Sequence, residues 1–303
     1  MRQAIQPLPF GRGSEGVTGP RPSAIGPEVM SRFLHKCRFF KVAAASWFLL
    51  ASAGASLAAA PPKFLLITQI EVRPGRGPEL SQLEAARSNA LAIAKWPTVS
   101  IAMKSVTGLT EIWYLTGYDS LEKYDRDQEA VQHNPGLKTE MDQFETRERD
   151  LVLSKRDILL VYHDDISYRP DFDWAQFRCL DAIRIHLRQG HHAEYLENRK
   201  ITVDAHKKGG IDEHLLVYTV VSGAPSASYL VLRALKSIHQ IEVLNEQHDH
   251  GGEIFAAGEE ARMISLFAAS VESEEEEDFC ADPSMSYVTK SWAKMNPDFW
   301  HGF

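Results

Sequence analysis

The sequence predicts an α+β protein made of two similar halves, each with the element order β-α-β-β-α-β. An internal repeat is the main reason. Residues 70–80 (IEVRPGRGPEL) align with residues 185–195 (IHLRQGHHAEY) at an offset of 115, and both pass from an alternating strand pattern through a glycine into a helical pattern. Further along, residues 113–115 align with residues 230–232 at an offset of 117. Several matches in order, at a nearly constant offset, indicate a duplicated unit.

The first half shows the expected sequence of apolar patterns. Strands are predicted at 64–73, 99–106, 111–116 and 158–163, and helices at 78–94 and from about 120 to 153, with an interruption at Pro135-Gly136. Pro78 suits the first turn of a helix, whereas Pro97 prevents a helix from continuing. Asp119 or Ser120 is the predicted cap of the second helix, because both side chains can accept a hydrogen bond from a free backbone N–H group.

The second half repeats this order with one segment that is harder to place. Strands are predicted at 182–188, 215–221 and 229–234, and helices at 192–208, after a cap at Ser237, and at 259–269. Residues 272–278 (ESEEEED) form an acidic run, which we interpret as a solvated loop or helix end. The last strand is therefore expected between residues 279 and 287, and the aromatic tail is expected to pack onto the body of the protein.

The amino-terminal region predicts export. Residues 1–29 are rich in Gly and Pro and are interpreted as a disordered or mis-annotated extension, with Met30 as a candidate true start. Residues 30–58 carry a basic segment, an uncharged apolar segment and a small-x-small motif, which together predict a signal peptide cleaved after Ala58. An uncleaved anchor is the less favoured alternative, because a spanning helix needs about 20 apolar residues. The predicted location is periplasmic or secreted.

Domain boundaries follow from the repeat and from the signal peptide. The predicted first domain covers residues 62–165, a linker covers 166–179, the second domain covers 180–290, and the tail covers 291–303. After cleavage, 26 basic and 39 acidic residues remain, a net charge of −13. This acidic balance argues against nucleic acid as a partner, because phosphate binding needs a basic face. No later segment is apolar enough for a stable membrane anchor.

Two cysteines remain after the predicted cleavage, Cys179 and Cys280. An exported protein can form a disulfide between such residues. Pairing cannot be deduced from the number of cysteines alone, and we favour two separate thiols while leaving a bridge open.

The two strand-glycine-helix openings, together with residues 113–137, resemble the dimeric α/β barrel superfamily, of the antibiotic biosynthesis monooxygenase and NIPSNAP-like type. The resemblance implies two tandem ferredoxin-like domains whose antiparallel sheets face each other as an intrachain α/β barrel. It implies a monomer with pseudo-two-fold symmetry or, alternatively, a homodimer. Because some barrel relatives use haem, it leaves the cofactor unknown.

Ionisable side chains gather on one face of the opening strand in each half. Adjacent residues of a strand point to opposite faces, so Ile70 and Ile185 are expected to meet the helices while their neighbours face the barrel interior. The candidate ligand-binding residues are Glu71, Arg73, Trp113, Tyr114, Arg184, His186 and Arg188. Which of the two aromatic residues points inward depends on strand register. The alternative is that the charged members form ion pairs where the sheets meet.

Histidines outside these strands give weaker signals. His133 aligns with His250 and is interpreted as a polar helix end. His248, His250 and Glu253 form an H-x-H-x-x-E pattern with metal-ligand types, but three such ligands do not recur in the first half. We therefore interpret them as solvent-exposed and predict no metal site.

No established catalytic motif is present in the sequence, whether G-x-S-x-G, H-E-x-x-H, C-x-x-C or C-x-x-C-H. The favoured function is non-catalytic binding of a small polar or aromatic ligand between the two sheets. The alternative is a monooxygenase-like or haem-using enzyme of the α/β barrel type.

Overall fold

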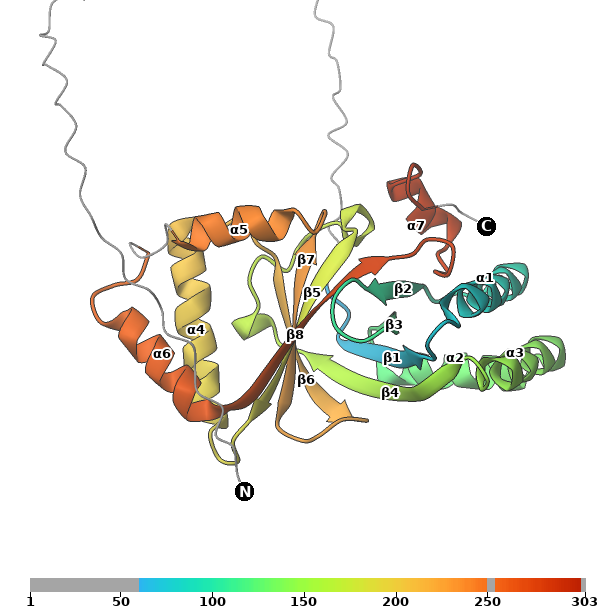
Figure 1. Ribbon diagram of the computed structural model, residues 1–303, viewed down its shortest axis with the longest axis horizontal. Helices are drawn as coiled ribbons and strands as arrows, with labels where there is room; N and C mark the ends of the chain where they lie inside the picture. Colours follow the sequence, from blue (N-terminus) through green and yellow to red (C-terminus); the bar gives the residue numbers. More distant parts are fainter. Residues whose placement is uncertain (1–59, 250–253, 301–303) are drawn as a thin grey trace, which may run out of the picture. The chain divides into compact units, whose positions relative to one another are not determined.

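Residues 60–249 and 254–300 are described by a computed structural model, shown in Figure 1. The strands are β1 (Phe64–Val72), β2 (Ser100–Ser105), β3 (Glu111–Tyr118), β4 (Val152–Tyr162), β5 (Cys179–Leu187), β6 (Leu215–Ser222), β7 (Ser228–Leu235) and β8 (Val271–Ala281). The helices are α1 (Gly77–Ile93), α2 (Leu121–Gln132), α3 (Pro135–Glu148), α4 (His192–Gly209), α5 (Gln240–Asp249), α6 (Glu259–Ser270) and α7 (Lys290–Met295). Two single 3₁₀ turns, η1 (Asp164–Ile166) and η2 (Trp174–Gln176), precede β5. The predicted signal segment lies outside the described residues. Within them, no helix has the length and apolar character needed to cross a membrane.

The eight strands form one closed antiparallel barrel in the order β1-β3-β2-β8-β5-β7-β6-β4. The predicted α+β class and the closure of a barrel within one chain are confirmed. The strand order is β4-β1-β3-β2 in the first half and β8-β5-β7-β6 in the second. Two seams join the halves: β2 pairs with β8, and β4 pairs with β6. The second strand of each half therefore pairs with the last strand of the other, which leaves no open sheet edge.

The helices lie on the outer face of the barrel (Figure 1). Helices α1 and α3 cover the first half, where Ile70 and Val72 belong to an outer core with Leu80. Helices α4 and α6 cover the second half, where Ile185 and Leu187 belong to a second outer core. A third core fills part of the barrel interior and contains, from every strand, residues that alternate with the helix-facing ones. The strand faces therefore follow the alternation that the sequence predicts.

The acidic run contradicts its prediction. Residues 272–278 are not a loop or helix end but the centre of β8, which pairs with β5 over nearly its whole length. Two features permit this arrangement: Val271 and Phe279 are buried near the two ends, and Arg184 of β5 faces the carboxylates of Glu275 and Glu277. The last strand therefore begins eight residues before the predicted segment.

The helix caps show one success and one error. Ser120 caps α2 as expected, with its side chain accepting a hydrogen bond from the N–H of Lys123 at 3.2 Å. Ser237 does not cap the following helix through its side chain. Instead, α5 begins at Gln240, whose side chain accepts a hydrogen bond from the N–H of Lys236 at 2.8 Å.

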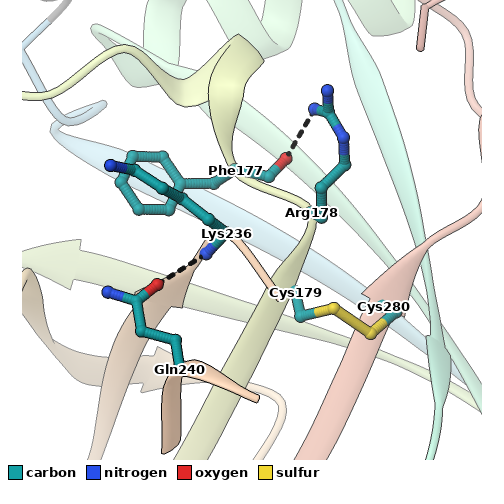
Figure 2. Close-up of a disulfide and its surroundings, with 6 residues drawn as sticks. All are labelled: Phe177, Arg178, Cys179, Lys236, Gln240 and Cys280. Atoms are coloured by element: carbon teal, nitrogen blue, oxygen red, sulfur yellow. Dashed lines mark hydrogen bonds between the residues drawn. A yellow bond between two sulfur atoms is a disulfide. The ribbon is translucent and has the colours of Figure 1, made fainter. Parts of the chain in front are cut away.

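A disulfide joins Cys179 to Cys280, so the preference for separate thiols is wrong (Figure 2). The two residues are direct partners in the register between β5 and β8, with Cα atoms 4.0 Å apart. The sequence did not indicate this pairing, because the acidic run was interpreted as a loop or helix end and not as the strand that pairs with β5. The bond lies close to the seam at which Met103–Ser105 of β2 meets β8.

Removing the disulfide will destabilise the barrel. The bond closes a segment with a sequence separation of 101. We expect the double substitution Cys179→Ala and Cys280→Ala to lower the free energy of unfolding by about 2–4 kcal/mol, because the unfolded chain regains conformational freedom. Urea denaturation measures this loss, and the unsubstituted protein under reducing conditions should match the variant. Equal stability in all three samples would show that the bond is not formed.

Next to the seam between β4 and β6, Gly223 lies so close to the backbone of β4 that we predict no larger residue is tolerated there. Gly223 has φ +87°, and a Cβ atom there would lie 1.9 Å from the carbonyl oxygen of Asp157. Gly190 has nearly the same φ, +85°, but no atom within 4 Å of its would-be Cβ. Both Ala substitutions incur left-handed strain, but Gly223→Ala should cost at least about 2 kcal/mol more in unfolding free energy because of the clash. Equal losses, measured by urea denaturation, would argue against this seam.

Candidate functional site

A cavity of about 360 Å³ occupies one end of the barrel interior. Its apolar wall includes Ile67, Ile158, Leu160, Val220 and Leu230. Its polar residues are Gln69, Arg156, Arg184, His186, Ser228, Ser273 and Glu275. The strands contribute these side chains from their inward faces. The cavity therefore adjoins the apolar interior core, at the end of the barrel where the inward-facing residues become polar. We call it the polar cavity.

Arg184 is held by carboxylates of the neighbouring strand. Its Nη2 donates to Glu277 at 2.6 Å and its Nε donates to Glu275 at 3.2 Å. Its guanidinium also lies over the ring of Trp113, with 5.3 Å between the guanidinium carbon and the ring centroid. The charge of Arg184 is therefore compensated by β8 of its own half. The predicted alternative, an ion pair, is formed by this residue, but within the second half and not where the two halves meet.

His186 and Arg156 are the polar cavity's less constrained hydrogen-bonding groups. The Nδ1 of His186 lies 3.0 Å from Ser228 Oγ, and its Nε2 lies 3.6 Å from a carboxylate oxygen of Glu272. Arg156 is exposed, donates through Nε to the side-chain oxygen of Gln69 at 2.6 Å and forms no ion pair with any described residue. An imidazole and an uncompensated guanidinium thus face the same space.

The other predicted site residues are distributed over different surfaces. Tyr114 points to the helices, where its hydroxyl donates to Glu84 at 2.7 Å, while Trp113 points into the barrel. Glu71 accepts a hydrogen bond from Ser154 at 3.1 Å and does not line the polar cavity. Arg73 is exposed beyond the end of β1.

Arg188 follows β5, and its side chain contacts the carboxyl-terminal end of α6 and does not face the interior. Its guanidinium donates to the carbonyl oxygen of Ala268 at 2.8 Å and contacts that of Val271. The pairing of β5 with β8 shifts register between His186 and Leu187, and β5 ends at Leu187. Simple alternation therefore fails at Arg188, which is why the sequence prediction is wrong for this residue.

A second cavity, of about 280 Å³, was not predicted. We call it the apolar cavity. Interior residues, including Met103, Leu115 and Leu180, form one wall, and Trp174, Phe177, Trp292 and Trp300 cover it. Trp300 donates through Nε1 to the carbonyl oxygen of Ala175 at 2.9 Å, so the aromatic tail packs onto the body as expected. The run of aromatic residues in the tail was the available sequence signal.

The H-x-H-x-x-E pattern does not form as a unit among the described residues, because His250 and Glu253 lie outside them. His248 is half-buried, and its Nε2 lies 3.7 Å from a carboxylate oxygen of Glu213. The same oxygen lies 3.1 Å from Nδ1 of His206. The interpretation of His248 as solvent-exposed is therefore wrong. His133 is exposed at the end of α2, as a polar helix end is expected to be.

Glu213 belongs to a buried charged group on the outer face of the second half. Arg233 lies between two carboxylates, with Nε 2.7 Å from Glu213 and Nη1 3.0 Å from Asp181. Burial raises the pKa of Asp181, and Glu276 and Asp278 add to this effect against the influence of Arg233. Burial also opposes ionisation of Glu213, but His206, His248 and Arg233 hold the pKa of its carboxyl well below its usual range.

This charged group was not predicted, although the sequence contains a signal for it. Asp181 shares the helix-facing side of β5 with Ile183 and Ile185, where a charge is unusual. Arg233 is its partner in the register with β7. A charged residue within an otherwise apolar face therefore marked the position of a polar partner on the adjacent strand.

Comparisons with known proteins extend only to the fold. No protein-family model matches the sequence, and no curated protein matches it. A monooxygenase candidate from Fusobacterium nucleatum superposes with a TM-score of 0.50 at 10% identity, covering 73% of this chain and 93% of that chain. A chlorite dismutase candidate has a TM-score of 0.45 at 10% identity, covering 77% and 99%. A haem-binding protein from Thermus thermophilus has a TM-score of 0.42 at 9% identity, covering 74% and 92%. The chain has a fold similar to that of dimeric α/β barrel proteins, and the sequence resemblance is confirmed at that level.

The described residues do not fit a haem group. The polar cavity, at about 360 Å³, is larger than the apolar cavity. Its volume is nevertheless close to the lower limit of ordinary ligand pockets, about 300 Å³. Its imidazole, His186, has Nδ1 3.0 Å from Ser228 Oγ and Nε2 3.6 Å from a carboxylate oxygen of Glu272. His206 and His248 adjoin a smaller space of about 190 Å³ beneath α4 and face Glu213. Neither place offers a space of the size that a haem group needs.

The interaction free energy between Arg184 and Glu277 can be measured with a double-mutant cycle. Arg184→Met and Glu277→Gln each remove one partner from a partly exposed ion pair, so we expect a double-mutant cycle in urea to give a coupling of about 1–2 kcal/mol. The matched cycle of Arg188→Met with Glu277→Gln should be additive, because Arg188 contacts α6 instead. A coupling of zero in the first cycle would show that Arg184 is not held by β8 in solution.

Proposed function

We propose that the polar cavity binds a small aromatic ligand with phenolic or carbonyl oxygens. The observation that supports this proposal is the combination of an apolar wall with Arg156 and His186 in one cavity that opens to solvent at the end of the barrel. The positive charge of Arg184 is offset by Glu275 and Glu277, so the cavity favours neutral or weakly acidic ligands over strong anions. Such a site has the usual composition of a small-molecule pocket, with few polar groups that orient an otherwise apolar ligand.

The fold similarity to the monooxygenase candidate from Fusobacterium nucleatum leads us to propose a monooxygenase-like activity ahead of binding without catalysis. A reaction of this class balances without a cofactor when the substrate supplies all the electrons. A methylene group between two aromatic rings and one molecule of oxygen then give a carbonyl group and one water. In this proposal Arg156 binds a substrate oxygen, and His186 accepts the methylene proton, since imidazole exchanges protons near neutral pH.

Organisation and location are part of the same proposal. The identical strand order in the two halves supports a duplicated ferredoxin-like unit, with domains at 62–165 and 180–290. A barrel closed within one chain supports a monomer with pseudo-two-fold symmetry. The bond between Cys179 and Cys280 supports export, because disulfides persist in oxidising compartments.

The proposed function is tested with two neutral aromatic probes, anthrone for oxygen consumption and N-phenyl-1-naphthylamine for fluorescence. We expect anthrone-dependent oxygen uptake that falls at least about 100-fold in His186→Ala, because a general base contributes factors of this size. Arg156→Gln should raise KM more than it lowers kcat. Arg188→Gln is the matched control and should behave like the unsubstituted protein, since Arg188 does not line the cavity.

Two cavity-filling substitutions decide between the sites. Ala224→Trp narrows the polar cavity, and Val99→Trp narrows the apolar cavity. We expect only the first to abolish binding of N-phenyl-1-naphthylamine. Loss in Val99→Trp alone would move the ligand to the apolar cavity. Binding that depends on His186 without any oxygen uptake would restore the non-catalytic interpretation.

A further inference from the structure

Three side chains with metal-ligand atoms meet outside the barrel, away from the polar cavity. His206 lies in the last turn of α4, His248 lies near the end of α5, and Glu213 lies in the connection before β6. One candidate ligand atom from each residue lies within 4.8 Å of the other two. Elements distant in sequence thus bring two imidazoles and one carboxylate to a common point.

The spacing suits a small divalent ion. A tetrahedral zinc with bonds of about 2.0–2.1 Å places its ligand atoms about 3.4 Å apart. The carboxylate oxygen of Glu213 lies 3.1 Å from His206 Nδ1 and 3.7 Å from His248 Nε2, on either side of this value. Only small side-chain shifts are needed to complete such a geometry.

The candidate ligand atoms lack other satisfactory partners. Among the described residues, His206 Nδ1, His248 Nε2 and the carboxylate oxygen of Glu213 that faces them are buried and make no hydrogen bond of acceptable geometry. Glu213 itself is only 1% exposed. Buried polar atoms without hydrogen bonds are rare, and an ion that they coordinate is one of the few explanations for several at one point.

We propose that His206, Glu213 and His248 form a binding site for a divalent transition-metal ion, with zinc as the reference ion. Two imidazoles and one carboxylate are a ligand set that binds zinc or iron(II) while leaving coordination positions open. Calcium and magnesium are disfavoured, because they prefer sites built from oxygen ligands alone. The site is independent of the polar cavity and of the function proposed for it.

The charge of the surroundings is compatible with a cation. With neutral histidines, the charges of Glu213 and Arg233 cancel, and Asp181 adds one negative charge only in its ionised form, which burial opposes. Arg233 contacts the other oxygen of Glu213, at 2.7 Å, and so orients the carboxylate without occupying the oxygen that faces the histidines. This arrangement is the usual second layer of contacts that fixes a ligand in a metal site.

An open coordination position would face the space beneath α4. That space, about 190 Å³, is lined by the three candidate ligands and by Asn198, Arg199, Thr202 and Glu274. Nε and Nη2 of Arg199 are buried and have no hydrogen-bond acceptor among the described residues. A water molecule or a small oxyanion on the metal is the natural occupant, since it would accept a hydrogen bond from Arg199.

The competing explanation is a metal-free ion pair, in which a protonated histidine neutralises Glu213. Zinc affinity separates the two explanations. The full chain is freed of metal with a chelator, and zinc is titrated in competition with a chromophoric chelator. We expect one zinc ion per chain, a rise in Tm on zinc addition, and visible absorption bands of a tetrahedral site with cobalt(II).

Two ligand substitutions and one matched control complete the experiment. His248→Ala and His206→Ala should each weaken zinc binding at least about 100-fold, because the loss of even an outer contact costs 10–100-fold. His239→Ala, which removes an exposed histidine just before α5, should leave zinc affinity unchanged. Circular dichroism and the Tm of the metal-free proteins establish that each variant is folded. His248 is the less buried of the two, so its variant keeps the test valid if His206→Ala does not fold.

The proposal is overturned by any of three results. The unsubstituted protein binds no zinc at micromolar concentration, folded His248→Ala retains the original affinity, or only one of two folded ligand variants loses binding. In the first case the three residues form an ion pair without metal. In the second case zinc binds without His248, and in the third it binds at a site that includes only one of the two histidines.

Discussion

Closure of the sheet is the constraint on which the remaining structure depends. Pairing of β2 with β8 and of β4 with β6 satisfies the backbone groups of all eight strands within one chain. Once the sheet is closed, every second side chain must enter a confined interior, and the others must be covered by helices. The seams also fix Gly223, whose position against the backbone of β4 leaves no room for a side chain.

The closed interior separates apolar from polar side chains along the barrel axis. Leu65 and Ile67 of β1 belong to the interior core, whereas Gln69, farther along the same face, lines the polar cavity. On β5, Ala182 belongs to the core and Arg184 lies beside the carboxylates of β8. The acidic character of β8 therefore has a structural reason, because part of its charge compensates an arginine that closure turns inward.

The outer face of the second half has a different character. Asp181, Arg233 and Glu213 place charges beneath helices, where each unpaired charge would cost several kcal/mol. Mutual ion pairing offsets part of this cost but leaves the oxygen of Glu213 between two histidines. A buried charged group of this kind contributes little to stability compared with apolar residues of the same size. Stability alone therefore does not explain its presence, whereas a binding role does.

The sequence by itself determined the α+β class, most helix and strand positions and the inward direction of Arg184 and His186. These follow from local periodicity and from a repeat within the chain, which need no knowledge of distant contacts. Only the tertiary structure decided the position of β8, the disulfide, the outward turn of Arg188 and the meeting of His206, Glu213 and His248. The acidic run becomes a strand because it pairs with β5, and the three ligand residues come from separate elements whose approach depends on helix packing over the closed barrel. Such long-range pairing leaves no periodic signal in the sequence.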